Sequence, residues 1–378
     1  MIPFNKPYYS GNEAASILKA METHMLTGDL EIMRNCERFL EKKYDFKKAF
    51  LTNSCTMALE MAALLSEIQP GDEVIVPSYT FVSTANAFAL RGANIVFADS
   101  NPGDPNMNVA GLRALITPKT KVIVVVHYAG IPCDVEMIRS LADEYGLLIV
   151  EDAAQCIDSY YDKKALGSFG DISCFSFHET KNIHCGEGGL IVINNEKFLE
   201  KAEIIRNKGT NRAAFLREEV SKYEWVGLGF SSIPSAITAA FLYSQLENID
   251  QIQKQRMKLW KLYYNRLSDL KSHGIVLPVM PENATGNAHL FYLVCNNSQE
   301  RMELIDTLAT KNIQAVFHYQ SLHSSPYFRN QHDGRQLPNA DKFSECLVRL
   351  PLYYSLSEEE AGLVCTEILN FYNRKRTR

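Results

Sequence analysis

Residues 121–152 read KVIVVVHYAGIPCDVEMIRSLADEYGLLIVED and contain two apolar runs separated by a stretch of helical character. The runs 121–126 and 147–152 are almost continuously apolar rather than alternating, which is typical of strands buried on both faces. Between them, residues 135–145 have the length and composition of a helix. Because two neighbouring strands joined by a crossover helix run parallel, this segment predicts a β–α–β unit.

The same alternation extends over most of the first 240 residues. A helical pattern at 56–66 separates two further β-rich runs. All five of the additional runs are short and mostly apolar, and they lie at 49–52, 73–77, 94–98, 172–177 and 190–193. Together with the first two, they predict an α/β fold with a mainly parallel, seven-stranded sheet.

The pattern changes after residue 240. We expect a long amphipathic helix over 237–267, then a strand at 288–294, a helix at 299–311 and a strand at 315–319. The sequence therefore predicts a large α/β domain over residues 1–240, which includes the N-terminal segment. Residues 241–378 are expected to hold the connecting helix and a smaller C-terminal α+β domain.

Composition narrows the class of protein. The chain has 378 residues, 46% of them hydrophobic and 22% charged, which is ordinary for a soluble globular enzyme. Its formal net charge of −5 gives no indication of nucleic-acid binding. The N-terminus lacks a signal-peptide pattern and no stretch of 18 apolar residues occurs, so we expect no membrane association and a cytoplasmic location.

The nine cysteines are scattered and form no CxxC pair. Several lie within apolar runs, where cysteine acts as a small hydrophobic residue. This usage is typical of a reducing compartment and favours neither a disulfide framework nor a metal site.

Small polar residues follow the first predicted strand. Ser54, Cys55 and Thr56 open a helical segment, where backbone N–H groups and the positive end of the helix dipole suit a phosphate group. Simple capping of the helix is the alternative interpretation. No GxGxxG or GxxxxGK[ST] motif occurs, so the sequence supports neither a dinucleotide fingerprint nor a P-loop.

Three more strand ends carry chemically distinctive residues. Phe81 follows the second strand and could stack on a flat ligand, with Tyr79 as the competing aromatic residue. Asp152 ends the strand at 147–152, where a buried carboxylate needs a cation such as a protonated ring nitrogen. Ser176 lies in the strand at 172–177, and Lys181 follows it.

Ligands of open α/β sheets bind beyond the carboxyl ends of the strands, so we expect these groups to meet at one edge. A phosphate cradle, a stacking aromatic ring, an acid for a ring nitrogen and an amine are the requirements of pyridoxal 5′-phosphate. Lys181 would hold this cofactor as a Schiff base and would move the proton once a substrate amine displaces it. No metal ligand set is expected.

Along nearly its whole length, the chain resembles the DegT/DnrJ/EryC1 family of sugar-nucleotide aminotransferases. The matching motifs, in the family's order, are GDEVIVPSYTFVSTANA, VVVHYAG, VEDAAQ, CFSFHETKN, GEGG, IRNKGTNR and FHYQSLH. The resemblance implies the fold-type-I architecture of pyridoxal-phosphate-dependent aminotransferases, and a homodimer.

Residue by residue, the resemblance implies roles around the cofactor ring. Lys181 would carry the cofactor and Asp152 would pair with the pyridine nitrogen. Gln155 would reach the phenolic oxygen, while Phe81 and Ala154 would lie against the two faces of the ring.

The phosphate would be held by Ser176 together with Ser54, Cys55 and Thr56. Here the chain departs from the family's usual Ser-Gly-Thr, and because cysteine cannot take glycine-only torsions, Cys55 must have αR or β backbone angles. A second departure is Ser231, which stands where the family often has an Asn that crosses to the phosphate of the neighbouring subunit. A serine has a shorter reach than Asn.

Several polar residues have two possible readings. His318 and His323 could bind the sugar or diphosphate, or could lie between the two domains. Lys208 and Arg212, with the intervening Asn211, could bind the nucleotide diphosphate or belong to a solvated loop. For His178 and His184, which flank Lys181, a structural role is favoured over catalysis.

The resemblance implies transfer of an amino group from an amino acid, L-glutamate, to a keto-deoxysugar nucleotide, dTDP-4-keto-6-deoxy-D-glucose. The product would be dTDP-4-amino-4,6-dideoxy-D-galactose, with amination of a 3-keto sugar or an equatorial 4-amino product as alternatives. A sugar dehydratase of the same fold would carry histidine in place of Lys181. A non-catalytic regulator is disfavoured by the intact pair of Lys181 and Asp152.

Overall fold

A computed structural model of the chain describes residues 1–28 and 30–376. Its main feature is one seven-stranded sheet in the order β1-β9-β8-β5-β4-β2-β3. The strands β1 to β5, β8 and β9 lie within a residue or two of the seven predicted runs. Their bounds are β1 Ala49–Thr52, β2 Glu73–Pro77, β3 Asn94–Ala98, β4 Thr120–Val126, β5 Leu148–Asp152, β8 Ile172–Ser176 and β9 Gly189–Ile193.

The sheet is mainly parallel, as predicted. The neighbours β2–β3, β2–β4, β4–β5 and β5–β8 pair in parallel, whereas β9 is antiparallel to both β8 and β1. Because β9 alone is reversed, β1 points the same way as β8. The carboxyl ends of β1, β2, β4, β5 and β8 therefore share one edge of the sheet.

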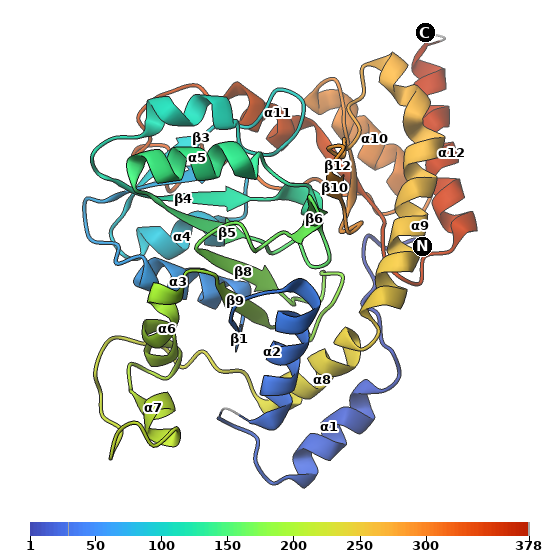
Figure 1. Cartoon of the computed structure of the whole chain (residues 1–378). Coiled ribbons are helices and arrows are strands. Elements are labelled where there is room, and N and C mark those ends of the chain that lie inside the picture. The colour runs from blue at the N-terminus through green and yellow to red at the C-terminus, as the bar shows by residue number, and fades with distance from the viewer. Residues whose placement is uncertain (29, 377–378) are drawn as a thin grey trace.

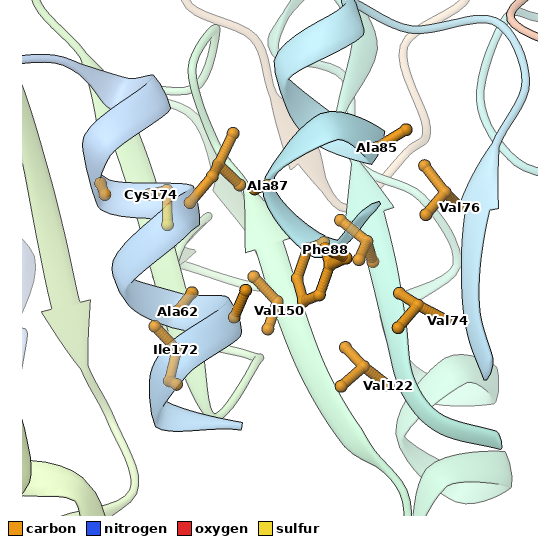
Figure 2. Packing of buried hydrophobic residues seen from close by; sticks show 14 of the residues in the cluster. Ala62, Val74, Val76, Ala85, Ala87, Phe88, Val122, Val150, Ile172 and Cys174 are labelled. Carbon is orange, nitrogen blue, oxygen red and sulfur yellow. The ribbon is translucent and has the colours of Figure 1, made fainter. Parts of the chain in front are cut away.

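Helices cover both faces of the sheet (Figure 1). On one face, α3 and α4 contribute side chains to the largest apolar core, and Figure 2 shows Ala62 and Phe88 packed near Val122 and Val150 of the sheet. The opposite face is covered by α5, with α2 and α8 over the other end of the sheet. The helices of this part are α1 Glu13–Glu22, α2 Glu31–Tyr44, α3 Cys55–Leu65, α4 Val82–Ala89, α5 Val135–Tyr145, α6 Leu199–Arg206, α7 Arg212–Leu216 and α8 Ala236–Leu246.

The long helix predicted over 237–267 is wrong, because two helices occupy that range. Helix α8 ends at Leu246 and α9 (Ile249–Leu267) begins three residues later. At the break, the Asn248 side chain donates a hydrogen bond to the Ser244 carbonyl at 2.8 Å, which competes with continuation of the helix. Helix α9 then leads away from the sheet toward α10 and α12 (Figure 1).

The C-terminal part packs around a second core made by α9, α10, α12 and the strand pair β11–β12. Its elements are β10 Ala284–Thr285, β11 Phe291–Val294, α10 Ser298–Thr310, α11 Pro338–Cys346, β12 Leu347–Leu350 and α12 Glu358–Arg376. The predicted strand at 315–319 is wrong: only Val316 forms a bridge, to Arg349, and the positive φ of Tyr319 (42°) turns the chain away. The boundary at residue 240 stays a prediction.

Smaller elements complete the chain. A three-stranded sheet that the sequence did not indicate pairs β10 with β6 and β6 with β7, and so joins residues 160–165 to the C-terminal part. The remaining elements are β6 Tyr160–Tyr161, β7 Lys164–Ala165 and the 3₁₀ turns η1 Val109–Leu115, η2 Tyr128–Gly130, η3 Glu196–Phe198 and η4 Ser268–His273.

Candidate active site

A cavity of about 880 Å³ lies at the edge of the sheet where β4, β5 and β8 end. The C-terminal part closes its other side with residues 289–290, 316–319, 349–350 and 352. Ten residues that the sequence assigned to a cofactor or substrate site line this cavity: Ser54, Cys55, Thr56, Phe81, Asp152, Ala154, Gln155, Ser176, Lys181 and His318.

One end of the cavity is formed by the start of α3. The Ser54 hydroxyl caps this helix by accepting a hydrogen bond from the Met57 N–H at 3.1 Å, and the Thr56 and Ser83 hydroxyls lie 2.8 Å apart. Strand β9 runs close against the loop, because a Cβ on Gly189 would lie 2.3 Å from the Ser54 carbonyl carbon. The result is a compact loop at the N-terminus of an 11-residue helix, which suits an anion.

Cys55 begins α3 and is not among the residues with positive φ, as its side chain requires. The loop therefore both caps α3 and lines the cavity. Cys55 is partly buried, and burial raises the pKa of its thiol, so it is a neutral group beside the helix start.

Asp152, at the end of β5, is buried and held by two donors. Its Oδ2 accepts a hydrogen bond from the Thr84 hydroxyl at 2.7 Å, and its Oδ1 accepts one from the Ala154 N–H at 3.2 Å. Thr84 is in turn 2.9 Å from the Thr80 hydroxyl. Burial raises the pKa of Asp152, and these hydrogen bonds and the charge of Lys181 oppose that rise. A cationic ring nitrogen at this point would complete the pairing of the carboxylate.

Lys181 lies in the tight loop after β8. The backbone N–H of Lys181 donates to the His178 carbonyl at 2.8 Å, and the backbone N–H of His178 donates to the Ser176 hydroxyl at 3.3 Å. Burial lowers the pKa of the Lys181 amine, while the neighbouring Cys55 and Asp152 act to raise it. A lysine with a lowered pKa is a better nucleophile and base near neutral pH than an exposed one.

Gln155 is fixed by the groups on either side of it. Its Oε1 accepts a hydrogen bond from the Ala129 N–H at 2.6 Å, and its Nε2 donates to the Tyr319 hydroxyl at 3.0 Å. Ala154 precedes it on the cavity wall.

Of the two aromatic candidates after β2, only Phe81 faces the cavity. Its side chain is half exposed, whereas Tyr79 is buried and donates its hydroxyl to the His318 carbonyl at 2.9 Å. The geometry therefore favours Phe81 as the stacking residue and gives Tyr79 a packing role.

The two histidines of the FHYQSLH motif are in different places. His318 lines the cavity and stacks on Tyr319, with the two ring centroids 3.5 Å apart. Its Nδ1 lies 2.8 Å from the Tyr128 hydroxyl. His323 lies outside the cavity, with Nδ1 2.7 Å from the Ser78 hydroxyl and Nε2 3.6 Å from Asp341. It bridges the end of β2 and α11, which corresponds to the interface alternative.

Three other predicted residues do not reach the cavity of this chain. Lys208 and Arg212 are exposed in the segment between α6 and α8. Ser231 is also exposed, and its carbonyl accepts a hydrogen bond from the Asn53 side chain at 2.9 Å. Within one chain, these residues are not brought together with Lys181.

The two histidines that flank Lys181 in the sequence also lie in different places. His184 is buried, and its Nε2 lies 2.8 Å from the Tyr8 carbonyl, which is a structural contact. His178 lines the cavity, where its Nδ1 is 3.0 Å from the Thr180 hydroxyl.

Sequence reasoning missed four residues around the cavity: Thr84, His289, Tyr319 and Arg349. Thr84 lies in the first turn of α4, four residues after Thr80, which precedes the helix, and its hydroxyl is within reach of Thr80 only because of how the chain enters α4. Arg349 interrupts the apolar run LVRLPL, which is an unusual place for a charge. Tyr319 lies within the quoted motif FHYQSLH but was assigned no role, and His289 carried no distinguishing pattern.

Pyridoxal phosphate fits these residues. The Ser54–Thr56 loop and Ser176 would hold its phosphate, and Asp152 would face its ring nitrogen. The close approach of β9 at Gly189 leaves this loop no room for a larger side chain on that strand. Fold and cavity together define a fold-type-I, pyridoxal-phosphate-dependent enzyme.

Comparison with known proteins identifies the family. The model of the DegT/DnrJ/EryC1/StrS aminotransferase family matches residues 8–369, and the chain belongs to this family. It is accordingly a pyridoxal-phosphate-dependent aminotransferase.

Individual relatives cover nearly the whole chain. The spore coat polysaccharide biosynthesis protein SpsC of Bacillus subtilis is 31% identical over 368 residues, which are 95% of this chain and 94% of SpsC. The pyridoxal-phosphate form of the putative sugar aminotransferase Spr1654 from Streptococcus pneumoniae superimposes with a TM-score of 0.89 at 26% identity, covering 99% of both chains. DesV of S. venezuelae gives a TM-score of 0.89 at 29% identity, covering 98% of both.

Membrane-spanning helices and metal sites are two other features to consider. Within residues 1–28 and 30–376, no helix is long and apolar enough to cross a membrane. The same described residues contain no cluster of three or more His, Cys, Asp or Glu side chains placed to hold a metal ion. All nine cysteines are free thiols.

Proposed function

We propose that this aminotransferase moves an amino group from L-glutamate to a keto-deoxysugar nucleotide in the cytoplasm. The proposed acceptor is dTDP-4-keto-6-deoxy-D-glucose and the product dTDP-4-amino-4,6-dideoxy-D-galactose, as in the dTDP-4-amino-4,6-dideoxygalactose transaminase that the motifs SFHETKN and KGTNR resemble. Such a product would serve surface polysaccharides such as lipopolysaccharide O-antigen or enterobacterial common antigen. SpsC and Spr1654, whose names refer to polysaccharide and sugar chemistry, support the sugar class of substrate.

The observation that carries the proposal is the convergence of Lys181, Asp152 and the Ser54–Thr56 loop on one cavity. Pyridoxal phosphate supplies, when bound, a carbonyl that accepts the amino group and a ring that withdraws electrons from the reacting carbon. Lys181, whose pKa burial lowers, would take and return the proton at that carbon. Asp152, oriented by Thr84, would keep the ring nitrogen protonated.

Phe81, Ala154 and Gln155 would position the ring, and His318 would contact the sugar or diphosphate from the C-terminal part. We further propose that the enzyme is a homodimer, in which Ser231, Lys208 and Arg212 act at the partner's site. In support, the segment that contains Lys208 and Arg212 also exposes large apolar side chains, namely Leu216, Tyr223, Trp225, Val226 and Leu228.

The test uses the purified holoenzyme. L-Glutamate should change its visible absorbance, and subsequent addition of the keto-sugar nucleotide should restore it. A panel of 3-keto and 4-keto sugar nucleotides, with NMR of each product, would then report the aminated carbon and the orientation of the amine. Release of a deoxygenated sugar without a new amine would instead support the dehydratase. No response to any amino acid would contradict the proposed donor.

A further inference from the structure

His289 lines the same cavity as Lys181, and its backbone is held on both sides. Its N–H donates to the Asn287 side-chain oxygen at 2.9 Å, and its carbonyl accepts from Arg256 Nη2 at 2.7 Å. Arg256 Nε also donates, at 3.1 Å, to the carbonyl of Ala288, whose φ of 50° is unusual for a residue with a side chain. Contacts that hold a strained backbone in place leave the neighbouring imidazole little freedom of position.

The imidazole is fixed in one tautomer by Asn182, the buried residue that follows Lys181. The Asn182 Nδ2 donates to the Asn287 carbonyl at 2.7 Å and to Gln253 Oε1 at 2.9 Å. A backbone carbonyl can only accept, so this contact sets which side of the amide carries the nitrogen. The Asn182 Oδ1 then lies 3.0 Å from His289 Nδ1 and must accept, so Nδ1 carries the proton. The other ring nitrogen, Nε2, is therefore an acceptor.

The Nε2 atom of His289 has no hydrogen-bond partner within residues 1–28 and 30–376. It is not completely buried, and because His289 lines the cavity, a ligand there can reach it. Burial lowers the pKa of the imidazole, and the positive charges of Lys181, Arg256 and Arg349 lower it further. The ring is therefore neutral near pH 7, and Nε2 offers a lone pair rather than a proton.

A lone pair on the cavity wall suits a ligand group that donates a hydrogen bond. Ionised carboxylates and diphosphates only accept, and the amino group of the donor is the group that reacts, which leaves the hydroxyl groups of the sugar. We propose that His289 Nε2 accepts a hydrogen bond from the sugar hydroxyl next to the reacting carbonyl carbon. In a 4-keto-6-deoxy sugar this is the 3-hydroxyl, because carbon 5 carries the methyl group and no hydroxyl. The inference rests on the proposed sugar-nucleotide substrate and adds a residue that binds one of its hydroxyl groups.

Calorimetry with unreactive nucleotide sugars and the holoenzyme tests this directly. The parent ligand is dTDP-6-deoxy-D-galactose, which has a hydroxyl where the proposed product has its amine, and its 3-deoxy and 2-deoxy analogues each lack one more hydroxyl. Wild type should bind the parent at least about fivefold more tightly than the 3-deoxy analogue. In His289→Asn this ratio should fall below about twofold, because asparagine can still donate toward Asn182 but has no atom at the place of Nε2. The ratio between the parent and the 2-deoxy analogue should be the same in both enzymes.

His273→Asn is the matched control. His273 also belongs to the C-terminal part, where its ring centroid lies 5.9 Å from that of Tyr372, but it does not line the cavity. This variant should leave all three affinities unchanged. His289→Phe keeps an aromatic ring without either nitrogen and should lose the same selectivity as His289→Asn. It decides the question if His289→Asn does not fold or load cofactor.

Variants at His289 that keep the wild-type preference for the parent over the 3-deoxy analogue would overturn the inference, even if all three ligands bind more weakly. So would loss of selectivity for the 2-hydroxyl instead. If wild type moves the amino group of L-glutamate to the keto sugar but binds the parent and its 3-deoxy analogue equally, the inference fails and the proposed function stands. If wild type responds to no amino acid and binds none of the three sugars, both fail.

Discussion

Burial gives Asp152 and Lys181 opposite pKa shifts. It raises the pKa of the carboxyl and lowers the pKa of the amine, so each charge is destabilised by the site and partly stabilised by the other. Such a pair of groups, pushed toward neutrality in one cavity, is typical of an active site. Thr84 then fixes the orientation of the carboxylate.

Asp152→Asn should leave the fold and cofactor binding largely intact but slow both half-reactions by about 100-fold or more, which corresponds to about 2.7 kcal/mol. An amide has nearly the same shape and can still accept from Thr84, but it carries no charge to stabilise a protonated ring nitrogen. Stopped-flow absorbance with L-glutamate measures the effect. A variant as fast as wild type would show that the acid is misassigned.

Lys181 should be the point of covalent attachment. Borohydride treatment of the holoenzyme should fix the cofactor to the peptide that contains Lys181, as found by mass spectrometry, because it is the lysine that lines the cavity. Lys181→Ala should show no label, and Lys208→Ala should be labelled like wild type. Label on a different lysine in wild type would contradict the assignment.

Strand β5 ends in two carboxylates with different surroundings. Successive side chains of a strand point to opposite faces, so Asp152 faces the site while Glu151 turns into the protein. Glu151 is buried, lies 2.9 Å from His127 Nε2, and accepts from the backbone N–H groups of Gly167 and Phe169 at 2.8 Å. Burial alone would raise its pKa, but these donors and the His127 charge lower it overall.

Glu151→Gln should therefore destabilise the fold by about 1.5–3 kcal/mol at pH 7, the usual value for a hydrogen bond to a charged group. A carboxyl with a lowered folded-state pKa contributes stability above its ordinary pKa of 4.5, and this contribution is lost as pH falls through the folded-state value. The gap in melting temperature between wild type and variant should shrink between pH 6 and pH 3.5. An equal gap at both pH values would contradict this account.

The close approach of β9 to the start of α3 depends on Gly189. Gly189→Ala would place a methyl group 2.3 Å from the Ser54 carbonyl carbon, so the loop must move. We expect a loss of about 1–3 kcal/mol in stability and weaker pyridoxal-phosphate binding, measured by melting and by cofactor titration. Gly103→Ala is the control, because a Cβ there meets open space. Unchanged cofactor affinity in Gly189→Ala would show that the loop does not hold the phosphate.

The sheet and the C-terminal part together form the cavity. The carboxyl edge of the sheet supplies Lys181 and Asp152, and the C-terminal part supplies His318 and Arg349. The break between α8 and α9 directs the chain from the sheet toward the C-terminal part (Figure 1). Chain segments more than 160 residues apart in sequence thus meet in one cavity.

In the proposed homodimer, Ser231→Ala should leave the dimer intact and weaken pyridoxal-phosphate binding roughly two- to tenfold, the value of one hydrogen bond. Ser221→Ala, an exposed serine of the same region, should have no effect. Sedimentation gives the oligomeric state and absorbance titration the affinity. A fully active monomer would contradict the shared site, and complete loss of cofactor would mean that this contact is much stronger than one hydrogen bond.

The seven strands, and the residues that line the cavity at their carboxyl edge, could largely be predicted from the sequence, because burial of a strand and the chemistry of the residue after it are local properties. The sequence predicted ten residues that line the cavity, including Lys181 and Asp152. It also left the positions of Phe81 and Tyr79 open, since both aromatic residues follow the same strand.

Which distant segments meet could not be predicted from the sequence, because this depends on how the helices and strands pack. His318 and His323 are five residues apart in one motif, yet packing puts the first in the cavity and the second between β2 and α11. Packing also places Thr84 next to Asp152, and Arg349 in the same cavity as Lys181. Periodicity reports whether a side chain is buried, whereas the groups it is buried against depend on how whole elements pack, and no local pattern encodes that.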